Sequence, residues 1–437
     1  MKTINVGILG FGTVGAGVAD GLLRNRETMA KRLGVDVVLK NIADLDITRD
    51  RGVKIPEGIL TTDAMAVIHD PNVQIIVELI GGTGIAKKFI LEAIANGKCV
   101  VTANKKLLAE SGKEIFEAAS KAGVDIYFGA AVGGGIPIIR SLREGLAGNE
   151  IESIKGILNG TCNYILTRMI REGAAFAEVL ADAQKLGFAE ADPTLDIDGW
   201  DTAHKASLLA SLAYSIPVDP HKIEVKGIRN LSNVDVVYAG KLGYSIKLLA
   251  QIDRVGDQVA VGVHPTLIPN DHMLAAVNEV FNAVMVHGDL SDDLMFYGKG
   301  AGRAPTASTV VGDIGDIARN LATSDGARYK SAIRYDNEGK LSVMPAGDVT
   351  SEFYIRLMVE DRCGTFGQFG TIFGNHNVSI KLATSHAFLK GQEMEGIIPV
   401  VIRTHTAKTS DVEAAIEEIE KSGIVRGTPV LMRMIKK

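Results

Sequence analysis

The chain has 437 residues, a length that usually folds into two or three domains. Hydrophobic residues make up 46% and charged residues 23% of it, which is typical of a globular protein and excludes a disordered chain. The 47 basic and 52 acidic side chains give a net charge of −5, so the chain lacks the basic surplus that marks binding to nucleic acids and anionic membranes. Three cysteines are too few for a disulfide framework, and no apolar run is long enough to span a membrane, so we expect a cytoplasmic protein.

The first third of the chain alternates predicted strands with predicted helices. Strands are expected at residues 4–9, 35–43, 73–79, 99–102 and 124–128. One helical pattern reaches about residue 33, and further helices are expected at residues 85–96 and 111–122. Such alternation predicts βαβ crossovers and a mainly parallel sheet. We therefore expect an α/β domain in residues 1–135, completed by a helix at residues 305–321 with proline in its first turn.

The first strand ends in Gly10, Gly12 and Gly15, which have the spacing G-x-G-x-x-G and precede a helix. The first glycine permits a tight turn, the second lets the backbone approach a pyrophosphate, and the third lets strand and helix pack closely. The N–H groups and dipole of the helix then attract the phosphates. A plain glycine-rich turn would show the same spacing, but the place between strand and helix favours a Rossmann-type dinucleotide-binding domain.

Asp44 follows the second strand, where an acidic side chain can accept hydrogen bonds from the ribose 2′-hydroxyl of NAD. The nearest basic residues considered for a 2′-phosphate are Lys40 and Arg49, and neither lies immediately beside Asp44. This position therefore favours NAD over NADP. The alternative is that Asp44 and Asp46 are solvated turn residues.

After residue 135 the alternation gives way to a different pattern. Strands are expected at residues 151–158, 223–228, 246–255, 258–263 and 281–286. Helices are expected between them at residues 163–170, 176–186 and 202–214. This pattern predicts an α+β domain in residues 136–304, with a largely antiparallel sheet and a hairpin turn at residues 255–258.

The C-terminal part begins with a polar, glycine-containing segment at residues 322–350 that has the composition of a linker. Beyond it the elements follow the order strand, helix, strand, strand, helix, strand, at residues 353–359, 365–376, 378–384, 396–404, 410–422 and 428–434. This is the ferredoxin-like order, so we expect a third domain in residues 351–437.

Two polar clusters are candidates for chemistry. Lys105 and Lys106 follow a buried strand at its carboxyl end, the edge at which open α/β sheets bind ligands, although an adjacent lysine pair is often simply solvated. The second cluster, residues 187–205, ends in Asp201 and Lys205, which share a face of a largely apolar helix. A lysine there, with carboxylates nearby, suits proton transfer, whereas the plain alternative is a surface ion pair.

Three further glycine loops favour a shared ligand site over three unrelated turns, and they lie at residues 133–137, 159–161 and 297–302. Cys162 lies just inside a predicted helix N-terminus, which lowers the pKa of a thiol. No histidine is evidently paired with it in the sequence, so we favour a buried structural cysteine over a nucleophile. The histidines and cysteines show no spacing typical of a zinc site.

Together these motifs resemble the homoserine dehydrogenase family, in its long form with a C-terminal ACT domain. The resemblance covers nearly the whole chain, and residues 187–205 are its most specific stretch. It implies the reversible NAD(P)-dependent interconversion of L-homoserine and L-aspartate 4-semialdehyde, on the route to threonine and methionine. It also implies that residues 136–304 bind substrate and dimerise, that the protein is a homodimer or homotetramer, and that the ACT domain binds an effector such as threonine.

The resemblance further implies roles for particular residues. Lys205 would donate and accept the proton at the reacting oxygen, and Lys105 would lie near the nicotinamide and the substrate. Glu190, Asp196 and Asp201 would bind the substrate, chiefly its ammonium group. The cofactor would be contacted by the first glycine motif and by two later glycines, namely Gly10, Phe11, Gly12, Thr13, Val14, Gly15, Gly160 and Gly302.

Two positions depart from the family pattern. In the family, a loop after the strand near residues 124–129 resembles a sodium site formed by one glutamate side chain and three backbone carbonyls. The carbonyl positions match Val132, Gly134 and Ile136, but Gly129 stands at the glutamate position. The family usually has a basic residue for NADP after the second strand, and this chain has Asp44 there. The resemblance therefore implies NAD(P) as cofactor and a sodium site, whereas the departure at Asp44 favours NAD and the departure at Gly129 removes the carboxylate from the sodium site.

Two other functions compete with this interpretation. One is an aldehyde-oxidising dehydrogenase that uses Cys162 as its nucleophile. The other is an amino-acid sensor that only retains a dinucleotide-binding fold, against which the intact set of Glu190, Asp201 and Lys205 argues.

Overall fold

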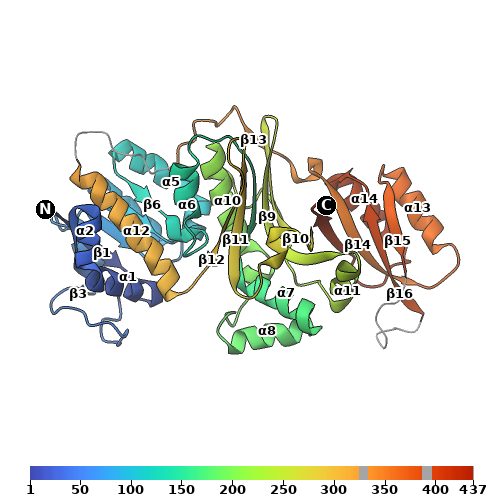
Figure 1. The fold of residues 1–437 in the computed structure, drawn as a ribbon, viewed down its shortest axis with the longest axis horizontal. Helices are drawn as coiled ribbons and strands as arrows, with labels where there is room; N and C mark the ends of the chain where they lie inside the picture. The colour runs from blue at the N-terminus through green and yellow to red at the C-terminus, as the bar shows by residue number, and fades with distance from the viewer. Residues whose placement is uncertain (324–332, 386–395, 437) are drawn as a thin grey trace. The chain divides into compact units, whose positions relative to one another are not determined.

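The structure of the protein is a computed structural model that describes residues 1–323, 333–385 and 396–436 (Figure 1). The chain forms two compact units, each of which draws on three stretches of sequence. The first consists of Met1–Ile151, Ser207–Pro220 and His287–Leu341, and the second of Glu152–Ala206, His221–Val286 and Ser342–Lys437. This division differs from the predicted boundaries at residues 135, 304 and 351, because strand pairing joins the C-terminal residues to the α+β region.

The first unit contains a six-stranded sheet in the order β3-β2-β1-β4-β5-β6. The paired strands are parallel throughout. Its strands are β1 (Lys2–Leu9), β2 (Val35–Ala43), β3 (Leu60–Thr61), β4 (Ile75–Glu78), β5 (Cys99–Thr102) and β6 (Ile126–Tyr127). This is the strand order of the doubly wound dinucleotide-binding fold, so the predicted α/β architecture is confirmed.

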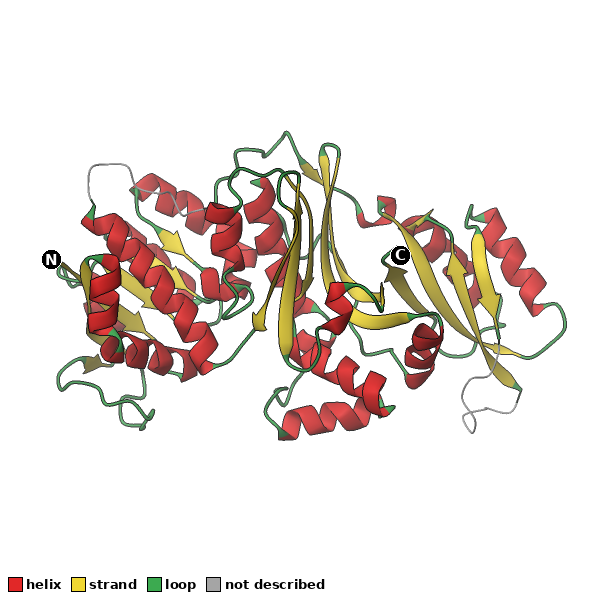
Figure 2. Ribbon diagram, viewed as in Figure 1, coloured by secondary structure: helices red, strands yellow, loops and turns green. Residues whose placement is uncertain are grey.

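Helices cover this sheet, as Figure 2 shows. α1 (Thr13–Arg24), α2 (Arg26–Leu33) and α12 (Arg303–Ala322) contribute apolar side chains to one core with the strands. The helical pattern expected to reach residue 33 is therefore two helices, which meet at Asn25. The helices between the later strands are α3 (Ala64–His69), α4 (Ile85–Ala95) and α5 (Lys105–Ala122). Among the described residues, no helix has the length and apolar character needed to cross a membrane.

The second unit contains most of a larger sheet, in which its strands follow the order β11-β7-β9-β10-β18-β14-β16-β15. The α+β region supplies β7 (Ile151–Ile157), β8 (Glu224–Val225), β9 (Tyr244–Val255), β10 (Gln258–Pro269) and β11 (Phe281–Gly288). β9 and β10 are antiparallel and pair Val255 with Gln258, which confirms the predicted hairpin. The helices of this region are α7 (Gly160–Glu172), α8 (Phe176–Lys185), α9 (Thr194–Ile197), α10 (Trp200–Tyr214) and α11 (Asn233–Lys241).

The C-terminal domain has the predicted ferredoxin-like order. It consists of β14 (Thr350–Glu360), α13 (Thr365–Asn375), β15 (Ile380–Thr384), β16 (Ile397–Thr404), β17 (Ala407–Lys408), α14 (Thr409–Lys421) and β18 (Val430–Met434). β14 pairs antiparallel with both β16 and β18, and β15 pairs with β16. Phe353, Phe369, Phe373 and Ile419 belong to an apolar core of its own.

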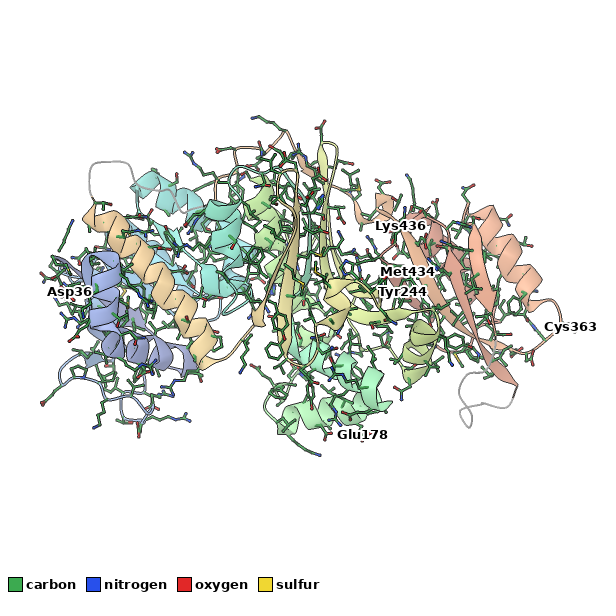
Figure 3. All side chains as sticks on the ribbon, in the orientation of Figure 1. Asp36, Glu178, Tyr244, Cys363, Met434 and Lys436 are labelled. Atoms are coloured by element: carbon green, nitrogen blue, oxygen red, sulfur yellow. The ribbon has the colours of Figure 1, made fainter. Side chains whose placement is uncertain are left out.

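The C-terminal domain is nevertheless continuous with the α+β sheet, because β18 pairs with β10 through Thr266–Arg433 and Leu267–Met434. Met434 and Tyr244 mark this junction in Figure 3. Part of the predicted linker also joins the sheet, since β13 (Ser342–Val343) pairs with β10. Residues 324–332 of that linker lie outside the described residues. Segments that were predicted as linker and separate domain are thus partly built into the larger sheet.

Candidate active site

The glycine turn between β1 and α1 has the geometry that its spacing predicts. Gly10 has a φ of +97°, and a Cβ there would lie 2.8 Å from the backbone of Leu79. A Cβ at Gly15 would lie 2.0 Å from the carbonyl oxygen of Gly10. Gly12 caps α1, and no described atom lies within 4 Å of the position of its missing Cβ. The turn is therefore tight on its inner side and open at the start of the helix, which suits a bound pyrophosphate.

Asp44 turns back towards this glycine loop. Its Oδ2 accepts a hydrogen bond from the Phe11 N–H at 2.5 Å, and its Oδ1 accepts one from the Asp46 N–H at 2.9 Å. The Nη2 of Arg51, a residue that sequence reasoning missed, lies 4.0 Å from Asp44 Oδ1 and 3.9 Å from Asp46 Oδ2. The side chains of Asp44 and Arg51 are each 18% exposed, so Asp44 is not a freely solvated turn residue. A carboxylate and a guanidinium therefore stand together at the end of β2.

A buried glutamate at the end of β4 organises the neighbouring loops. Glu78 is 0% exposed, and its Oε1 accepts hydrogen bonds from the N–H groups of Ile80 at 2.8 Å and Gly81 at 3.0 Å. Its Oε2 accepts a hydrogen bond from the Thr102 hydroxyl at 2.8 Å. The backbone N–H of Asn104 donates to the same hydroxyl oxygen at 3.0 Å. Sequence reasoning missed this network, although an acidic residue inside an apolar strand was a visible signal.

The same network fixes the start of α5, where Lys105 is the first residue. Asn104 caps the helix by accepting from the Leu107 N–H at 3.2 Å, and its Nδ2 donates to the Gly82 carbonyl at 2.6 Å. Lys105 is half-buried, whereas Lys106 is exposed and lies 3.9 Å from Glu110. The structure thus separates the two candidate lysines, and Lys105 is the one held at the edge of the sheet.

Two of the predicted glycine loops pack on each other in the first unit. A Cβ at Gly134 would lie 2.4 Å from the Gly300 carbonyl oxygen, and the Gly135 N–H donates to the Lys299 carbonyl at 3.1 Å. Gly302, with a φ of +119°, then caps α12. The third loop, with Gly160 at the start of α7, belongs to the second unit.

The space beside Gly129, where the resemblance predicted a glutamate side chain, is occupied by a carboxylate from α12. Asp313 of α12 is buried, and its carboxylate accepts a hydrogen bond from the Gly129 N–H at 2.8 Å. A Cβ at Gly129 would lie 2.9 Å from Oδ1 and 3.0 Å from Oδ2 of Asp313. Burial raises the pKa of Asp313 to about 7. The Asp313 carboxylate therefore occupies the space that a side chain at residue 129 would need.

Two of the three backbone oxygens predicted for sodium already accept hydrogen bonds. The Gly134 carbonyl accepts from the Thr309 hydroxyl at 2.7 Å, and the Ile136 carbonyl accepts from the Ile138 N–H at 2.8 Å. Val132 is buried in the same loop. Within the described residues, no group of three or more histidine, cysteine, aspartate or glutamate side chains is arranged to hold a metal ion.

The second unit brings Lys205 and Asp201 together in a buried ion pair. The Nζ of Lys205 lies 2.6 Å from Asp201 Oδ2, and both side chains are 10% exposed. The same Nζ donates a hydrogen bond to the Leu158 carbonyl at 2.6 Å. The predicted helix face is confirmed, and the alternative of a surface ion pair is wrong because α10 is buried on this side.

Asn159 connects this pair to a second carboxylate. Its Nδ2 donates to Asp196 Oδ1 at 2.7 Å and to Asp201 Oδ2 at 2.9 Å. Its Oδ1 accepts from the Cys162 N–H at 2.8 Å and thereby caps α7. One amide side chain thus links the start of α7 to two carboxylates and, through Asp201, to Lys205. Sequence reasoning treated Asn159 only as a helix cap.

Glu190 is not part of this cluster. It is exposed in the loop between α8 and α9, and in the described part of the chain its carboxylate makes no hydrogen bond to Asp201 or Lys205. Its backbone carbonyl accepts from Gln184 Nε2 at 3.1 Å.

Gly160, a predicted cofactor contact at the start of α7, lies against the backbone of another segment. A Cβ at Gly160 would lie 2.8 Å from the Val280 carbonyl oxygen, so close packing requires a glycine here.

Cys162 is a structural cysteine. It is 0% exposed, and its Sγ donates to the Asp196 carbonyl at 3.2 Å. Burial and the charges of Asp196 and Asp201 raise the pKa of its thiol well above the usual value. A thiol that resists ionisation is a poor nucleophile, so the aldehyde-oxidising alternative loses its key residue.

A doubly wound sheet with this glycine turn, together with a buried lysine–carboxylate cluster suited to proton transfer, defines an NAD(P)-dependent oxidoreductase. Comparison with known sequences specifies which one. The homoserine dehydrogenase family matches residues 137–314, and the NAD binding domain of homoserine dehydrogenase matches residues 10–129. Homoserine dehydrogenases of Neisseria gonorrhoeae and Bacillus subtilis are 43% and 38% identical, over 99% and 98% of this chain and of theirs respectively.

Solved structures agree with these sequence matches. A homoserine dehydrogenase from Thiobacillus denitrificans is 40% identical, with a TM-score of 0.92 over 100% of this chain and 99% of that one. A homoserine dehydrogenase from Staphylococcus aureus is 31% identical, with a TM-score of 0.77 over the full length of both chains. A hyperthermophilic archaeal homoserine dehydrogenase in complex with NADPH is 26% identical, with a TM-score of 0.60 over 71% of this chain and 96% of that one. The chain belongs to the homoserine dehydrogenase family.

Proposed function

We propose that the protein oxidises L-homoserine to L-aspartate 4-semialdehyde, reversibly, and that Lys205 is its acid–base group. The observation that carries this assignment is the buried Lys205–Asp201 pair with Asn159 and Asp196 around it. A nicotinamide cofactor, when bound, accepts or supplies the hydride. Oxidising an alcohol also requires that the hydroxyl proton leave, and reducing the aldehyde requires that the same oxygen be protonated. An amine at the Lys205 position can serve both directions.

The cluster also suits the substrate's ammonium group. Asp201 pairs with Lys205, and Asn159 links Asp196 to Asp201, so the cluster holds two acidic side chains and one basic one and has an acidic surplus in a largely buried environment. A cation is the ligand that such a charge favours, and ammonium–carboxylate hydrogen bonds are among the stronger ones. Glu190, which is exposed in the adjacent loop, remains a proposed third contact on the basis of the resemblance alone.

Steady-state turnover tests this function directly. The enzyme should reduce NAD⁺ or NADP⁺ with L-homoserine and yield a semialdehyde that a hydrazine reagent can trap. N-acetyl-L-homoserine, which lacks the ammonium charge, should have a KM at least roughly tenfold higher, because a lost ion pair of about 1.4 kcal/mol is a factor of ten. Equal kinetics with both compounds would contradict the assignment of the carboxylates.

The cofactor half of the proposal places the pyrophosphate at residues 10–15 and the ribose at Asp44. Phe11, Thr13 and Val14 belong to this turn, and the N–H groups at the start of α1 suit the phosphates. Lys105 and Gly302, each at the start of a helix in the same unit, are proposed as further contacts near the nicotinamide. The Asp44 carboxylate favours NAD, whereas Arg51 supplies a cation that a 2′-phosphate can use. We therefore infer that both cofactors are accepted, with NAD favoured or comparable.

We infer no need for sodium in this enzyme. The Asp313 carboxylate holds the Gly129 N–H directly and fills the space in which a side chain of residue 129 would reach an ion. These contacts fit a loop at residues 129–136 that is held by hydrogen bonds to α12, rather than a cation site. Activity in sodium chloride should equal activity in potassium or tetramethylammonium chloride at the same ionic strength. A selective dependence on sodium would contradict this inference.

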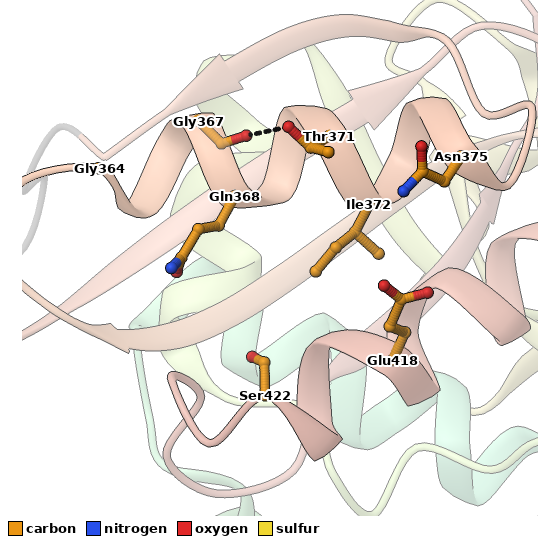
Figure 4. Close-up of a pocket in the computed structure, with 8 residues that line it drawn as sticks. All are labelled: Gly364, Gly367, Gln368, Thr371, Ile372, Asn375, Glu418 and Ser422. Atoms are coloured by element: carbon orange, nitrogen blue, oxygen red, sulfur yellow. Dashed lines mark hydrogen bonds between the residues drawn. The ribbon is translucent and has the colours of Figure 1, made fainter.

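The C-terminal domain is proposed as an ACT domain that responds to an amino acid such as threonine. A groove of about 550 Å³ lies between α13 and α14 and is lined by polar side chains that include Gln368, Thr371 and Asn375 (Figure 4). Hydroxyl and amide groups of this kind suit a zwitterionic ligand. The proposal extends to a cytoplasmic homodimer or homotetramer. Inhibition assays with millimolar threonine, and sedimentation of the enzyme, test these two points.

A further inference from the structure

Residues Glu224–Arg229, here called the coupling segment, contact the substrate cluster on one side. The Ile228 N–H donates to the Ile197 carbonyl at 2.8 Å. Arg229 binds the Asp198 carboxylate through two hydrogen bonds of 2.9 and 3.0 Å. Because Ile197 and Asp198 lie between Asp196 and Asp201 in the chain, the coupling segment borders the stretch that carries both carboxylates.

This contact leaves no free space. A Cβ at Gly227 would lie 2.1 Å from the Ile197 carbonyl oxygen and 2.4 Å from the Asp198 Cα. Gly199 has a φ of +89°, and a Cβ there would lie 3.2 Å from the Val225 side chain. Interiors packed this closely transmit displacements rather than absorbing them. A shift of the coupling segment must therefore shift the backbone between the two carboxylates.

The other side of the coupling segment is held by the C-terminal domain. Lys226 Nζ lies 2.6 Å from Glu413 Oε1 of α14 and 2.8 Å from Glu224 Oε1. Glu224 also pairs with Arg433 of β18, and both of these side chains are 10% exposed. Arg433 further donates to the Thr409 hydroxyl at 3.2 Å. The coupling segment is thus fixed by two charged contacts to a part of the chain that holds no proposed catalytic residue.

We propose that the coupling segment is a positioning element of the substrate site, whose place is set by the C-terminal domain through Lys226–Glu413 and Glu224–Arg433. The proposal rests on the proposed function in one respect, namely that Asp196 and Asp201 bind L-homoserine. It predicts a split in the kinetics, because the coupling segment belongs to the second unit and the glycine turn to the first. Disturbing the segment should change the KM for L-homoserine and leave the KM for NAD⁺ unchanged.

The strongest test uses Gly227→Ala in the full-length enzyme. The added methyl has no room, so the KM for L-homoserine should rise roughly tenfold or more, since small displacements of substrate-positioning groups have large kinetic effects. Gly240→Ala is the matched control, because Gly240 lies in α11 with no described atom within 4 Å of its Cβ position. Melting temperatures of both variants separate this effect from unfolding.

A second variant tests the same link without crowding. Glu413→Gln weakens the contact to Lys226, and Glu417→Gln removes a comparable charge from the same helix, where it pairs with Lys421. The KM for L-homoserine should rise roughly threefold in Glu413→Gln, as expected for a partly exposed ion pair, and stay unchanged in Glu417→Gln. Amide hydrogen exchange in residues 194–205 should be faster in Glu413→Gln than in Glu417→Gln.

The outcomes distinguish this proposal from the function on which it rests. A folded Gly227→Ala enzyme with the KM for L-homoserine of Gly240→Ala overturns the coupling. Should Gly227→Ala fail to fold, the Glu413→Gln variant decides, and unchanged KM and exchange overturn it. Absence of wild-type L-homoserine turnover would contradict the proposed function instead, and the exchange comparison would still decide whether the coupling exists.

Discussion

The dinucleotide residues of the first unit and the substrate residues of the second are built by different means. The dinucleotide turn consists mainly of backbone groups, whose positions are fixed by Gly10 and by the Asp44 carboxylate, while the buried Glu78 holds the N–H groups of the loop after β4. The substrate cluster consists of side chains that hold one another, with Asn159 between Asp196 and Asp201. Backbone sites tolerate changes in neighbouring side chains, whereas a network of mutually paired side chains loses function when one member is removed.

The largest expected effect is at Lys205. Lys205→Ala should lower kcat by roughly a thousandfold, because general acid–base catalysis contributes about 10²–10⁴ in rate. The dissociation constant for NADH, measured by fluorescence titration, should stay within about twofold of wild type, because the lysine acts on the substrate oxygen. Lys185→Ala is a suitable control, since that side chain is 77% exposed. Turnover close to wild type in Lys205→Ala would refute the assignment.

At Glu78, in the unit with the dinucleotide turn, we expect the opposite pattern, namely weaker cofactor binding with little effect on the substrate. Glu78→Gln keeps the shape but weakens hydrogen bonds to two N–H groups and a hydroxyl, and bonds to charged groups contribute about 1.5–3 kcal/mol each. The KM for NAD⁺ should rise about tenfold, which corresponds to ~1.4 kcal/mol, and the KM for L-homoserine should change little. Glu92→Gln, at a partly exposed position on α4, controls for the loss of charge. Equal changes in both KM values would contradict the separation of the two sites.

A shift of similar size, but in preference rather than in rate, is expected at the end of β2. Asp44→Ser removes the carboxylate that repels a 2′-phosphate, so the ratio of kcat/KM for NADP⁺ to that for NAD⁺ should rise about tenfold, equivalent to ~1.4 kcal/mol. Arg51→Ala should move the ratio in the opposite direction, because Arg51 is the cation next to Asp44. If this ratio of kcat/KM values stayed at the wild-type value in both variants, neither side chain would contact the 2′ position of the ribose.

The last expected effect is on stability, and no change in turnover is predicted from it. The pKa of Asp313 is raised to about 7 by burial, whereas an exposed aspartate titrates near pH 4, so folding takes up a proton between these values. Stability should therefore fall as pH rises through this window and level off above it. Asp313→Asn still offers an oxygen to the Gly129 N–H, and its melting temperature should depend less on pH between about 5 and 7. If the melting temperatures of the wild type and of Asp313→Asn changed equally with pH across that range, the raised pKa of Asp313 would be contradicted.

Much of the fold could be predicted because its signals are local. The strand at residues 35–43 coincides with β2, and the periodicity of residues 305–321 lies inside α12. β12 (Asp292–Lys299) and α11 were missed, and the predicted strand at residues 223–228 is reduced to β8. The polar segment at residues 322–350 looked like a linker, yet Ser342 and Val343 pair with β10. Short elements of this kind owe their conformation to distant partners rather than to their own sequence.

The site divides in the same way. Asp201 and Lys205 could be predicted because they are four residues apart on one helix. Glu78 meets Thr102 across 24 residues, Asn159 meets Asp201 across 42, and Gly129 meets Asp313 across 184. No periodicity or spacing reports contacts over such separations. The sequence therefore indicates which residue types are available, and the fold determines which of them meet.

Asp201→Asn gives the most direct test of the central claim that the substrate and the dinucleotide are bound by separate residue sets. Two constants should be measured on the same preparation, the KM for L-homoserine and the dissociation constant for NADH. Removing one charge from the cluster of Asp196, Asp201 and Lys205 should raise the KM for L-homoserine roughly tenfold or more, while NADH binding stays at the wild-type value. An unchanged KM for L-homoserine, or a loss of NADH binding of the same size, would contradict the account.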